Sequence, residues 1–475
     1  MRRGHAPIAA GIVLLALLIG QIAHGEAASP QTDPSLAVVS EDPYTNPGTY
    51  HRTQVEPDTY AFGSTIVSVF QSGRSTNWGA SNFGWSVSSD AGAIWTDGFL
   101  PGTTKHATPP GRWQRVTDSA VTYDAKHDAW LIIGVGTRPC SFSLECAGSQ
   151  VFVSRSTDGA QTFEDPIIPK RAGRSQFHDV PWVTCDNFTG SPYYGNCYSV
   201  WADDAHRALM SAYTSSDGGR TWTKATIAPK HHYLGHPIPV VRPDGTIVVL
   251  FHGPDGRQSF VSTDGGARYS GPYDLPQGNE RWMADGLRSD GVLVISPDVD
   301  AEGTVYAAFA DCTLRSAERP CSHNDITIST SDDGRHWSDM RRVPIDPVTS
   351  SVDHFFPTIA VDPSTSGASA HIGLVYYFYP EQHCDVTTCR LNVGFVSSTD
   401  GGSTWTAPLL LAGPFENTWF PQTDSGYMVG EYLGISFVDG KAIPVFPVAT
   451  EGRCKLGDVD SCNVWIASAT IPVGP

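Results

Sequence analysis

The octapeptide Ser215-Ser216-Asp217-Gly218-Gly219-Arg220-Thr221-Trp222 recurs almost unchanged as Ser398-Thr399-Asp400-Gly401-Gly402-Ser403-Thr404-Trp405. Four looser copies end in an aromatic residue at Trp95, Phe163, Tyr269 and Trp337, with aspartates at Asp90, Asp158, Asp264 and Asp332. The six aspartates are 68, 59, 47, 68 and 68 residues apart. A pattern that recurs at such intervals predicts a repeat architecture, in which each copy marks one structural unit.

The residue types of the repeat indicate a structural role. Asp and Ser side chains accept hydrogen bonds from the amides of a tight turn, Gly takes a positive φ, and the aromatic ring packs between neighbouring sheets. The repeat therefore predicts a stabilised hairpin turn, and we assign no chemistry to its aspartates.

Short runs rich in β-branched and aromatic residues surround each repeat, as in the sixth unit at 358–361, 372–377, 391–397 and 408–411. Four strands per unit are typical of a propeller blade. Equivalent units begin near Glu56, Asp118, Asp179, His236, Asp290, His354 and Glu431. We therefore predict an all-β fold, a β-propeller of four-stranded antiparallel blades with the repeats between third and fourth strands. Seven blades are favoured, with six as the alternative.

The N-terminus is typical of a secretory signal peptide over residues 1–27. Arg2 and Arg3 precede an apolar run from Ile8 to Ile19 and the small-x-small sequence Ala23-His24-Gly25. An uncleaved signal anchor is the alternative. Residues 28–54 form an N-terminal segment, of which 36–40 could supply the missing last strand of the seventh blade, and the propeller occupies 55–475.

Cysteine usage agrees with an extracytoplasmic, secreted protein. The ten cysteines form five close pairs, which predict local disulfides: Cys140 with Cys146, Cys185 with Cys197, Cys312 with Cys321, Cys384 with Cys389, and Cys454 with Cys462. A zinc site is the alternative, but none of these pairs has the Cys-x-x-Cys spacing of zinc ligands.

The net charge and the motifs of the sequence indicate which partners and cofactors are expected. The formal net charge is -18 and no run of Lys and Arg is present, so nucleic acid is not an expected partner. The sequence has no Walker A motif and no Gly-rich dinucleotide fingerprint, and we expect no cofactor. Carboxylates alternate in 298–303 before Gly303, which could hold a structural calcium ion, but we interpret this segment first as a turn.

The predicted topology gathers polar residues on one face. First strands line the channel of a propeller, so their starts meet at one mouth, together with the loops between second and third strands. The seven residues at which the units begin therefore form a ring of carboxylates and imidazoles, which suits general acid and base chemistry. For any single member, a solvated or strand-capping role is the alternative.

The octapeptide resembles the Asp box, or BNR repeat, of sialidases. Arg390 is similar to the last arginine of that family's carboxylate-binding triad, and Arg74 sits where a second arginine falls. The segment 431–435 is similar to the one that holds the family's tyrosine nucleophile, which makes Tyr432 its counterpart. The stretch Val55-Glu56-Pro57 departs from the family's Arg-Ile-Pro motif, and the family's acidic partners have no match here.

Two functions follow. The resemblance and the ring predict a secreted glycoside hydrolase, sialidase-like and acting on chain ends, whose partner is a carbohydrate or glycoconjugate. Its candidate catalytic residues are Tyr432, Glu431, Asp118, Asp179 and Glu56; its candidate substrate contacts are Arg74, Arg390, His236, Asp290, His354, Trp113 and Trp419. Surface ion pairing of Arg390 and packing of Tyr432 and the tryptophans are the alternatives. The second function is a non-catalytic propeller that binds a glycan or a protein.

Overall fold

The fold is all-β, as predicted. The computed structural model describes residues 1, 34–138, 148–170, 177–203, 209–227, 235–281, 286–288, 294–315, 321, 323–381, 384–458 and 461–474. All strands belong to one unit of the chain, Pro34–Pro475. Apart from Met1, the predicted signal peptide lies outside the described residues, as do Asp290, Cys140 and Cys146.

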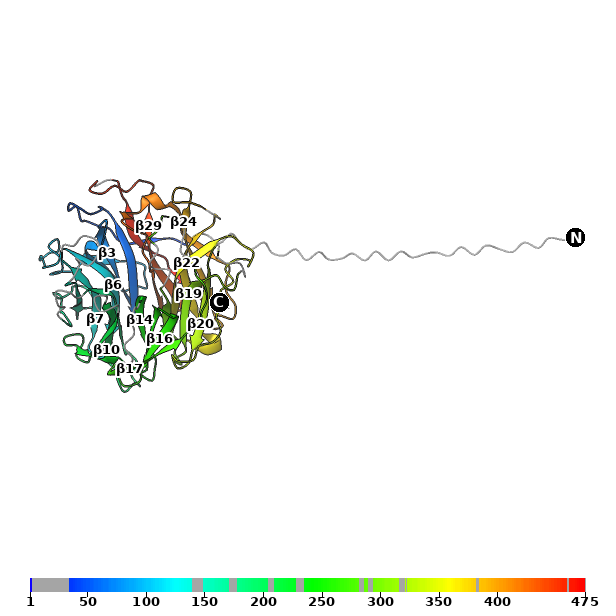
Figure 1. Ribbon diagram of the computed structural model, residues 1–475, viewed down its shortest axis with the longest axis horizontal. Coiled ribbons are helices and arrows are strands. Elements are labelled where there is room, and N and C mark those ends of the chain that lie inside the picture. Colours follow the sequence, from blue (N-terminus) through cyan, green and yellow to red (C-terminus); the bar gives the residue numbers. More distant parts are fainter. Residues whose placement is uncertain are drawn as a thin grey trace. The chain divides into compact units, whose positions relative to one another are not determined.

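The strands form seven antiparallel groups that follow one another along the chain (Figure 1). The first three are β2 (Gln54–Phe62), β3 (Thr65–Arg74), β4 (Ala80–Ser88) and β5 (Thr96–Phe99); β6 (Arg115–Asp124), β7 (Ala129–Thr137) and β8 (Gln150–Ser156); and β9 (His178–Cys185), β10 (Cys197–Asp203), β11 (Leu209–Ser215) and β12 (Thr223–Lys224). One pair, Ala80 with Val116, joins the first two groups into a single sheet.

The remaining four groups repeat this order. They are β14 (Gly235–Val241), β15 (Ile247–Gly253), β16 (Gly256–Ser262) and β17 (Arg268–Asp274); β18 (Ser296–Val299), β19 (Val305–Asp311), β20 (Asp325–Ser331) and β21 (Arg341–Arg342); β22 (Asp353–Val361), β23 (Ile372–Tyr379), β24 (Arg390–Ser398) and β25 (Leu409–Glu416); and β28 (Gly434–Val438), β29 (Lys441–Ala449), β30 (Val464–Ser468) and β1 (Ala37–Ser40). Short elements between or beside them are β13 (Thr226–Ile227), β26 (Gln422–Thr423), β27 (Gly426–Tyr427), β31 (Ile471–Pro472), η4 (Gly367–Ser369) and η5 (Asn417–Trp419).

The first strands of the groups contact one another in chain order. β2 contacts β6, β6 contacts β9, β9 contacts β14, and the series continues through β18 and β22 to β28. β28 also contacts β2, so the last group lies beside the first. The seventh group has its outer strand from the other end of the chain, because β1 pairs with β30 from Ala37 opposite Ser468 to Ser40 opposite Ile466.

Five of the six predicted turns lie between third and fourth strands, and the turn of Asp158 follows β8; all six are closed by Asp and Ser side chains. Asp217 accepts hydrogen bonds from the amides of Arg220 and Thr221 at 3.0 and 2.9 Å and from the Thr221 hydroxyl at 2.6 Å. Ser215 Oγ accepts one from the Gly219 amide at 2.9 Å.

The fifth turn corrects the predicted register by one residue. Asp333, rather than Asp332, accepts hydrogen bonds from the amides of Arg335 and His336, both at 2.8 Å. Ser331 Oγ accepts from the Gly334 amide, one residue closer than in the other turns. The turn is shorter, so the aspartate that reaches the amides is the next one along the chain.

Four of the five predicted disulfides are present: Cys185–Cys197, Cys312–Cys321, Cys384–Cys389 and Cys454–Cys462. The last three connect second to third strands of their groups, whereas Cys185–Cys197 connects β9 to β10. None of the helices in the described part of the chain has the length and hydropathy that a membrane crossing requires.

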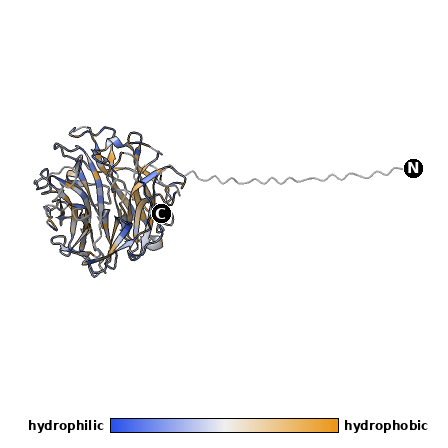
Figure 2. Cartoon of the chain, viewed as in Figure 1, coloured by the Kyte–Doolittle hydropathy of each residue, from blue (hydrophilic) through white to orange (hydrophobic). Residues whose placement is uncertain are grey.

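Hydrophobic residues lie along the strands (Figure 2), and their side chains pack in clusters between neighbouring sheets. One such cluster joins Leu131 and Ile133 of β7 to Val183 of β9 and Trp201 of β10. Because successive groups share clusters of this kind, burial of apolar surface holds each sheet to the next.

Candidate active site

Five first strands are bulged at equivalent places. In β2, β6, β9, β14 and β22, two residues oppose one residue of the second strand. The first residue of each bulge has a positive φ: Glu56, Asp118, Val180, His236 and Phe356, with φ between 42° and 58°. Left-handed backbone costs a non-glycine residue about 1–2 kcal/mol, and such strain is often found at functional sites.

The bulges correct two members of the predicted ring. Asp179 lies one residue before the bulge residue Val180, and His354 lies two residues before Phe356. In four of the five strands the bulge residue precedes a proline, as in Glu56-Pro57 and His236-Pro237. That proline was the signal in the sequence that would have set the register correctly.

Two buried glutamates form the centre of a polar cluster. Glu56 is 2% exposed and accepts a hydrogen bond from the Gln71 side-chain amide, and Glu431 is 4% exposed. Glu431 Oε1 accepts from Arg288 Nε at 2.8 Å, and its Oε2 lies 3.7 Å from His236 Nε2. The residue before Glu431, Gly430, lies against the Glu56 backbone, so the loop before β28 brings the two carboxyl groups to one place.

The two carboxyl groups differ in their pKa values. Burial, together with the charges of Glu431 and Asp118, raises the pKa of Glu56 to about 8. Burial acts on Glu431 in the same direction, but Arg288 and His236 outweigh it and lower the pKa of Glu431 to about 2. The surroundings of the two groups therefore favour the protonated form of Glu56 and the ionised form of Glu431, which is the division of roles that general acid and base chemistry requires.

Arg74, Asp118 and Tyr432 complete the cluster. Burial and the neighbouring Arg288 lower the pKa of Arg74 to about 10. The Asp118 carboxylate accepts hydrogen bonds from the Thr117 hydroxyl at 3.0 Å and the Val180 amide at 3.4 Å. The Tyr432 hydroxyl donates to the Ser119 carbonyl at 3.2 Å, and burial followed by the nearby Glu56 raises its pKa well above 10.

Arg288 was missed by the sequence analysis because it lies in a short segment without a strand pattern. The segment 286–288 runs parallel to β27, with the Arg288 amide bonded to the Tyr427 carbonyl at 3.0 Å. Gly286 lies directly against Val386, in the loop closed by Cys384–Cys389. Three segments that are distant in the sequence therefore meet at this arginine, and only the fold brings them together.

Several predicted contacts lie elsewhere. Arg390 pairs with Glu416 at 3.2 Å, the surface ion pair that was its alternative interpretation. Trp113 is 2% exposed and stacks on Phe152 at a centroid distance of 4.9 Å, which leaves no ring face for a sugar. Trp419 is half-buried beside Phe415.

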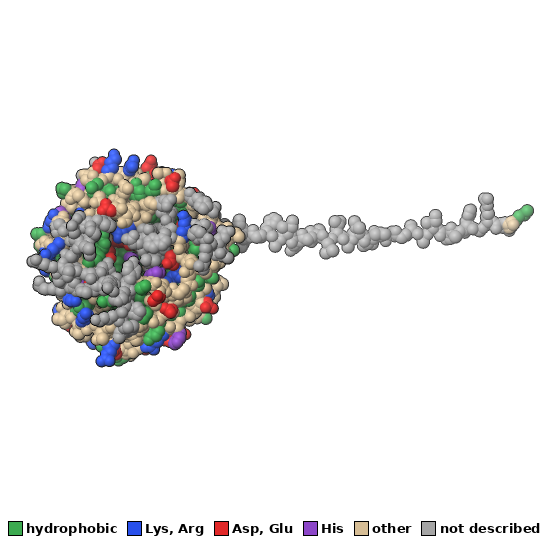
Figure 3. Space-filling view, viewed as in Figure 1, with side chains coloured by type: hydrophobic (Ala, Val, Ile, Leu, Met, Phe, Trp, Pro, Cys, Tyr) green, Lys and Arg blue, Asp and Glu red, His purple; other side chains and the backbone are tan. Residues whose placement is uncertain are grey.

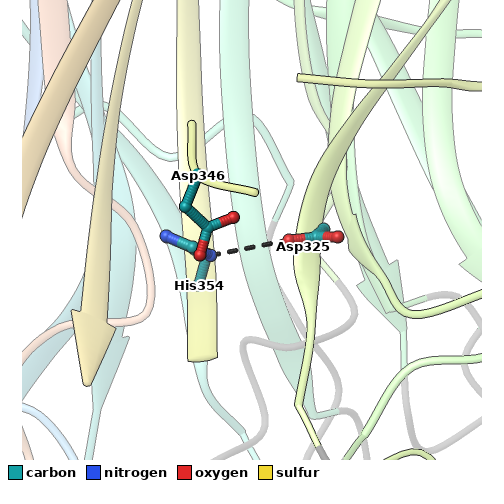
Figure 4. Close-up of side chains that lie close together, drawn as sticks. All are labelled: Asp325, Asp346 and His354. Atoms are coloured by element: carbon teal, nitrogen blue, oxygen red, sulfur yellow. Dashed lines mark ion pairs between the residues drawn. The ribbon is translucent and has the colours of Figure 1, made fainter. Parts of the chain in front are cut away.

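His354 belongs to a second polar cluster, with Asp325 and Asp346 (Figure 4). Its Nδ1 lies 3.7 Å from Asp325 Oδ1, and the candidate ligand atoms of the three residues all lie within 4.8 Å of one another. Arg315 pairs with both carboxylates at 2.9 and 3.1 Å, and Arg342 pairs with both as well. These arginines supply the positive charge that a metal ion would otherwise bring, so the cluster suits an ion-pair network better than a cation site.

The candidate calcium segment forms a turn, as preferred in the sequence analysis. Asp300 Oδ1 accepts from the amides of Glu302, Gly303 and Thr304 at 2.8 to 3.1 Å, and its Oδ2 accepts from Gly367. Asp298 accepts from the amides of Val299 and Val361. The carboxylate oxygens of Asp298 and Asp300 therefore already accept hydrogen bonds from backbone amides.

Acidic and basic side chains are interspersed over the face seen in Figure 3. No family model matches the sequence, and no curated protein matches it. Solved structures similar to the chain include sialidases and a polysaccharide lyase.

The Hadza microbial sialidase is 12% identical with a TM-score of 0.47, covering 89% of this chain and 66% of its own. A Trypanosoma rangeli sialidase mutant with trans-sialidase activity is 11% identical with a TM-score of 0.48, covering 78% of this chain and 59% of its own. A PL25 ulvan lyase is 11% identical with a TM-score of 0.48, covering 91% of this chain and 97% of its own. The chain thus spans less than two thirds of these two sialidases.

Proposed function

We propose that the protein is a secreted glycoside hydrolase whose seven strand groups are the blades of a propeller and whose active site is the cluster around Glu56 and Glu431. The cyclic contacts of the first strands, from β2 through β28 and back, support seven blades. Four disulfides support a location outside the cytoplasm. Cleavage of the signal peptide at residues 1–27 is part of the same proposal.

One observation carries the proposed reaction: two buried carboxyl groups share one site, and Glu431 pairs with Arg288 whereas Glu56 accepts from the uncharged Gln71. Glu56 would donate its proton to the glycosidic oxygen as the bond to the anomeric carbon breaks. Glu431 would act on the opposite side, either by attacking the anomeric carbon or by taking a proton from the attacking water. Arg288 keeps Glu431 ionised for either role.

Tyr432 is the nucleophile that the family resemblance implies, and the cluster suggests another role for it. Its hydroxyl donates to a backbone carbonyl, and its raised pKa keeps the phenol protonated. We therefore assign Tyr432 to positioning: its ring contacts Trp182 edge to face at 5.4 Å and holds the loop that carries Glu431.

The test is hydrolysis of a panel of chromogenic glycosides, sialosides included, by the secreted mature protein. Glu56→Gln and Glu431→Gln are expected to lower kcat at least 100-fold, in line with the loss of a general acid or base. Glu416→Gln is the control, because its carboxylate is 40% exposed and pairs with Arg390. Sialoside cleavage that is lost in Tyr432→Phe and Arg390→Ala, but kept in Glu56→Gln, would overturn the assignment to the two glutamates.

The alternative from the sequence is a non-catalytic propeller that binds a glycan or a protein. Well-folded protein without turnover on any glycoside, and without release of unsaturated products from uronate polysaccharides, would support binding over catalysis.

A further inference from the structure

Four buried polar atoms in the cluster have no hydrogen-bond partner among the described residues: Gln71 Oε1, Arg74 Nε, Ser119 Oγ and His236 Nδ1. Each belongs to a side chain or residue that is already held at another atom. Gln71 donates to Glu56, Arg74 donates to the Gly79 carbonyl, and His236 Nε2 faces Glu431. Buried polar atoms are rarely left unpaired in proteins, so each of these four atoms calls for a partner from a ligand or a water.

The chemistry of these four atoms points to hydroxyl groups. Arg74 Nε is a donor and Gln71 Oε1 is an acceptor, while the serine hydroxyl serves as both. A ligand that satisfies them needs donors and acceptors close together, as a sugar ring provides. The cluster reaches solvent at His236 and Arg288, whose side chains are each 15% exposed, so a ligand would approach past these two residues.

The arginines of the cluster already have acidic partners. Arg74 and Arg288 lie among three carboxyl groups, those of Glu56, Asp118 and Glu431. A carboxylate on the ligand would add an uncompensated negative charge to a buried site, which is unfavourable. Arg390, which resembles a family carboxylate ligand, is paired with Glu416 instead.

We propose that this site binds an uncharged, hydroxyl-rich glycosyl ring through Gln71, Arg74, Ser119 and His236, and that it selects against sugars carrying a carboxylate. The inference rests on the proposed function only in placing substrate at the same cluster.

The test is calorimetry on the Glu56→Gln variant, which removes the proposed acid without changing the charge of the cluster. The probes are methyl glucoside, galactoside and mannoside, the matching methyl uronides, and N-acetylneuraminic acid, at pH 7.5, where imidazoles are usually neutral. The expected result is at least 10-fold tighter binding of an uncharged glycoside than of its uronide. Tighter binding of a uronide or of N-acetylneuraminic acid, or no binding of any probe, would overturn the proposal.

A matched pair of serines separates recognition from folding. Ser119→Ala removes one unpaired hydroxyl and leaves the carbonyl that accepts from Tyr432, so affinity for the uncharged glycoside should fall about 2-fold to 10-fold. Ser199→Ala removes another buried, unpaired hydroxyl, on β10, and should leave affinity unchanged. Equal effects of the two changes would argue against the contact.

The two proposals fail separately. Binding of an uncharged glycoside without turnover of any glycoside by the unsubstituted protein would retain this inference and refute the hydrolase. Cleavage of sialosides in preference to uncharged glycosides would refute this inference and retain the hydrolase.

Discussion

Replacing Glu56 by Gln is expected to stabilise the protein at alkaline pH while it lowers kcat at least 100-fold. The pKa of Glu56 rises from 4.5 to about 8 on folding. Between these values the folded state binds more protons than the unfolded state, so the free energy of unfolding falls as pH rises. At about 1.4 kcal/mol per pKa unit, the full cost above pH 8 is roughly 5 kcal/mol, and relaxation of the cluster would reduce it. Gln is uncharged at every pH and keeps a carbonyl to accept from Gln71.

Urea unfolding followed by tryptophan fluorescence at pH 5, 7 and 9 measures this effect. The variant and the unsubstituted protein should have similar stability at pH 5, and the variant should become more stable by about 2–5 kcal/mol at pH 9. Glu416→Gln serves as the control and should show a difference that does not change with pH. If the advantage of Glu56→Gln does not grow with pH, the carboxyl group is not held protonated and the assignment of the acid is refuted.

Three further predictions concern activity, backbone strain and loop support. Turnover should decline as pH rises through about 8, because Glu56 then loses its proton, and a pH profile of kcat measures this. Ala91→Gly should raise the free energy of unfolding by about 1 kcal/mol, since Ala91 has φ 57° where the equivalent Gly218 has φ 73°; Ala93→Gly should lower it. Joint replacement of Cys384 and Cys389 by Ser should lower turnover several-fold below the unfolding temperature, because their loop supports the segment that carries Arg288. Activity unchanged in that double variant, as is expected for the Cys185 and Cys197 pair, would contradict the role of the loop.

Local patterns allowed much of the fold to be predicted. The turn of Asp217 is held by hydrogen bonds that span three or four positions, and short spacing alone paired Cys384 with Cys389. The register of the fifth turn was wrong because two aspartates, Asp332 and Asp333, stand side by side, and backbone geometry selects between them.

The candidate site was only partly predictable. Glu56, Asp118, His236 and Glu431 follow from where the first strands begin, but a bulge shifts the register by one residue, which the strand pattern does not reveal. Arg288 depends on the pairing of segments about 140 residues apart, at Leu287 and Tyr427, and no local signal encodes that contact. Because contacts of this kind join residues far apart in the sequence, the full set of site residues could be identified only from the structure.

The pairing of β1 with β30 makes the seventh sheet mechanically distinct. Ala37 and Ser468 lie opposite each other at the same end of the strand pair, so tension on the two chain ends would open its hydrogen bonds one after another. The two strands would therefore separate one hydrogen bond at a time, and their bonds would not resist the tension together as they would in shear. A chain emerging in the direction of synthesis would leave residues 37–40 without a partner until residues 464–468 had followed. During synthesis, the first strand to appear would be among the last to pair.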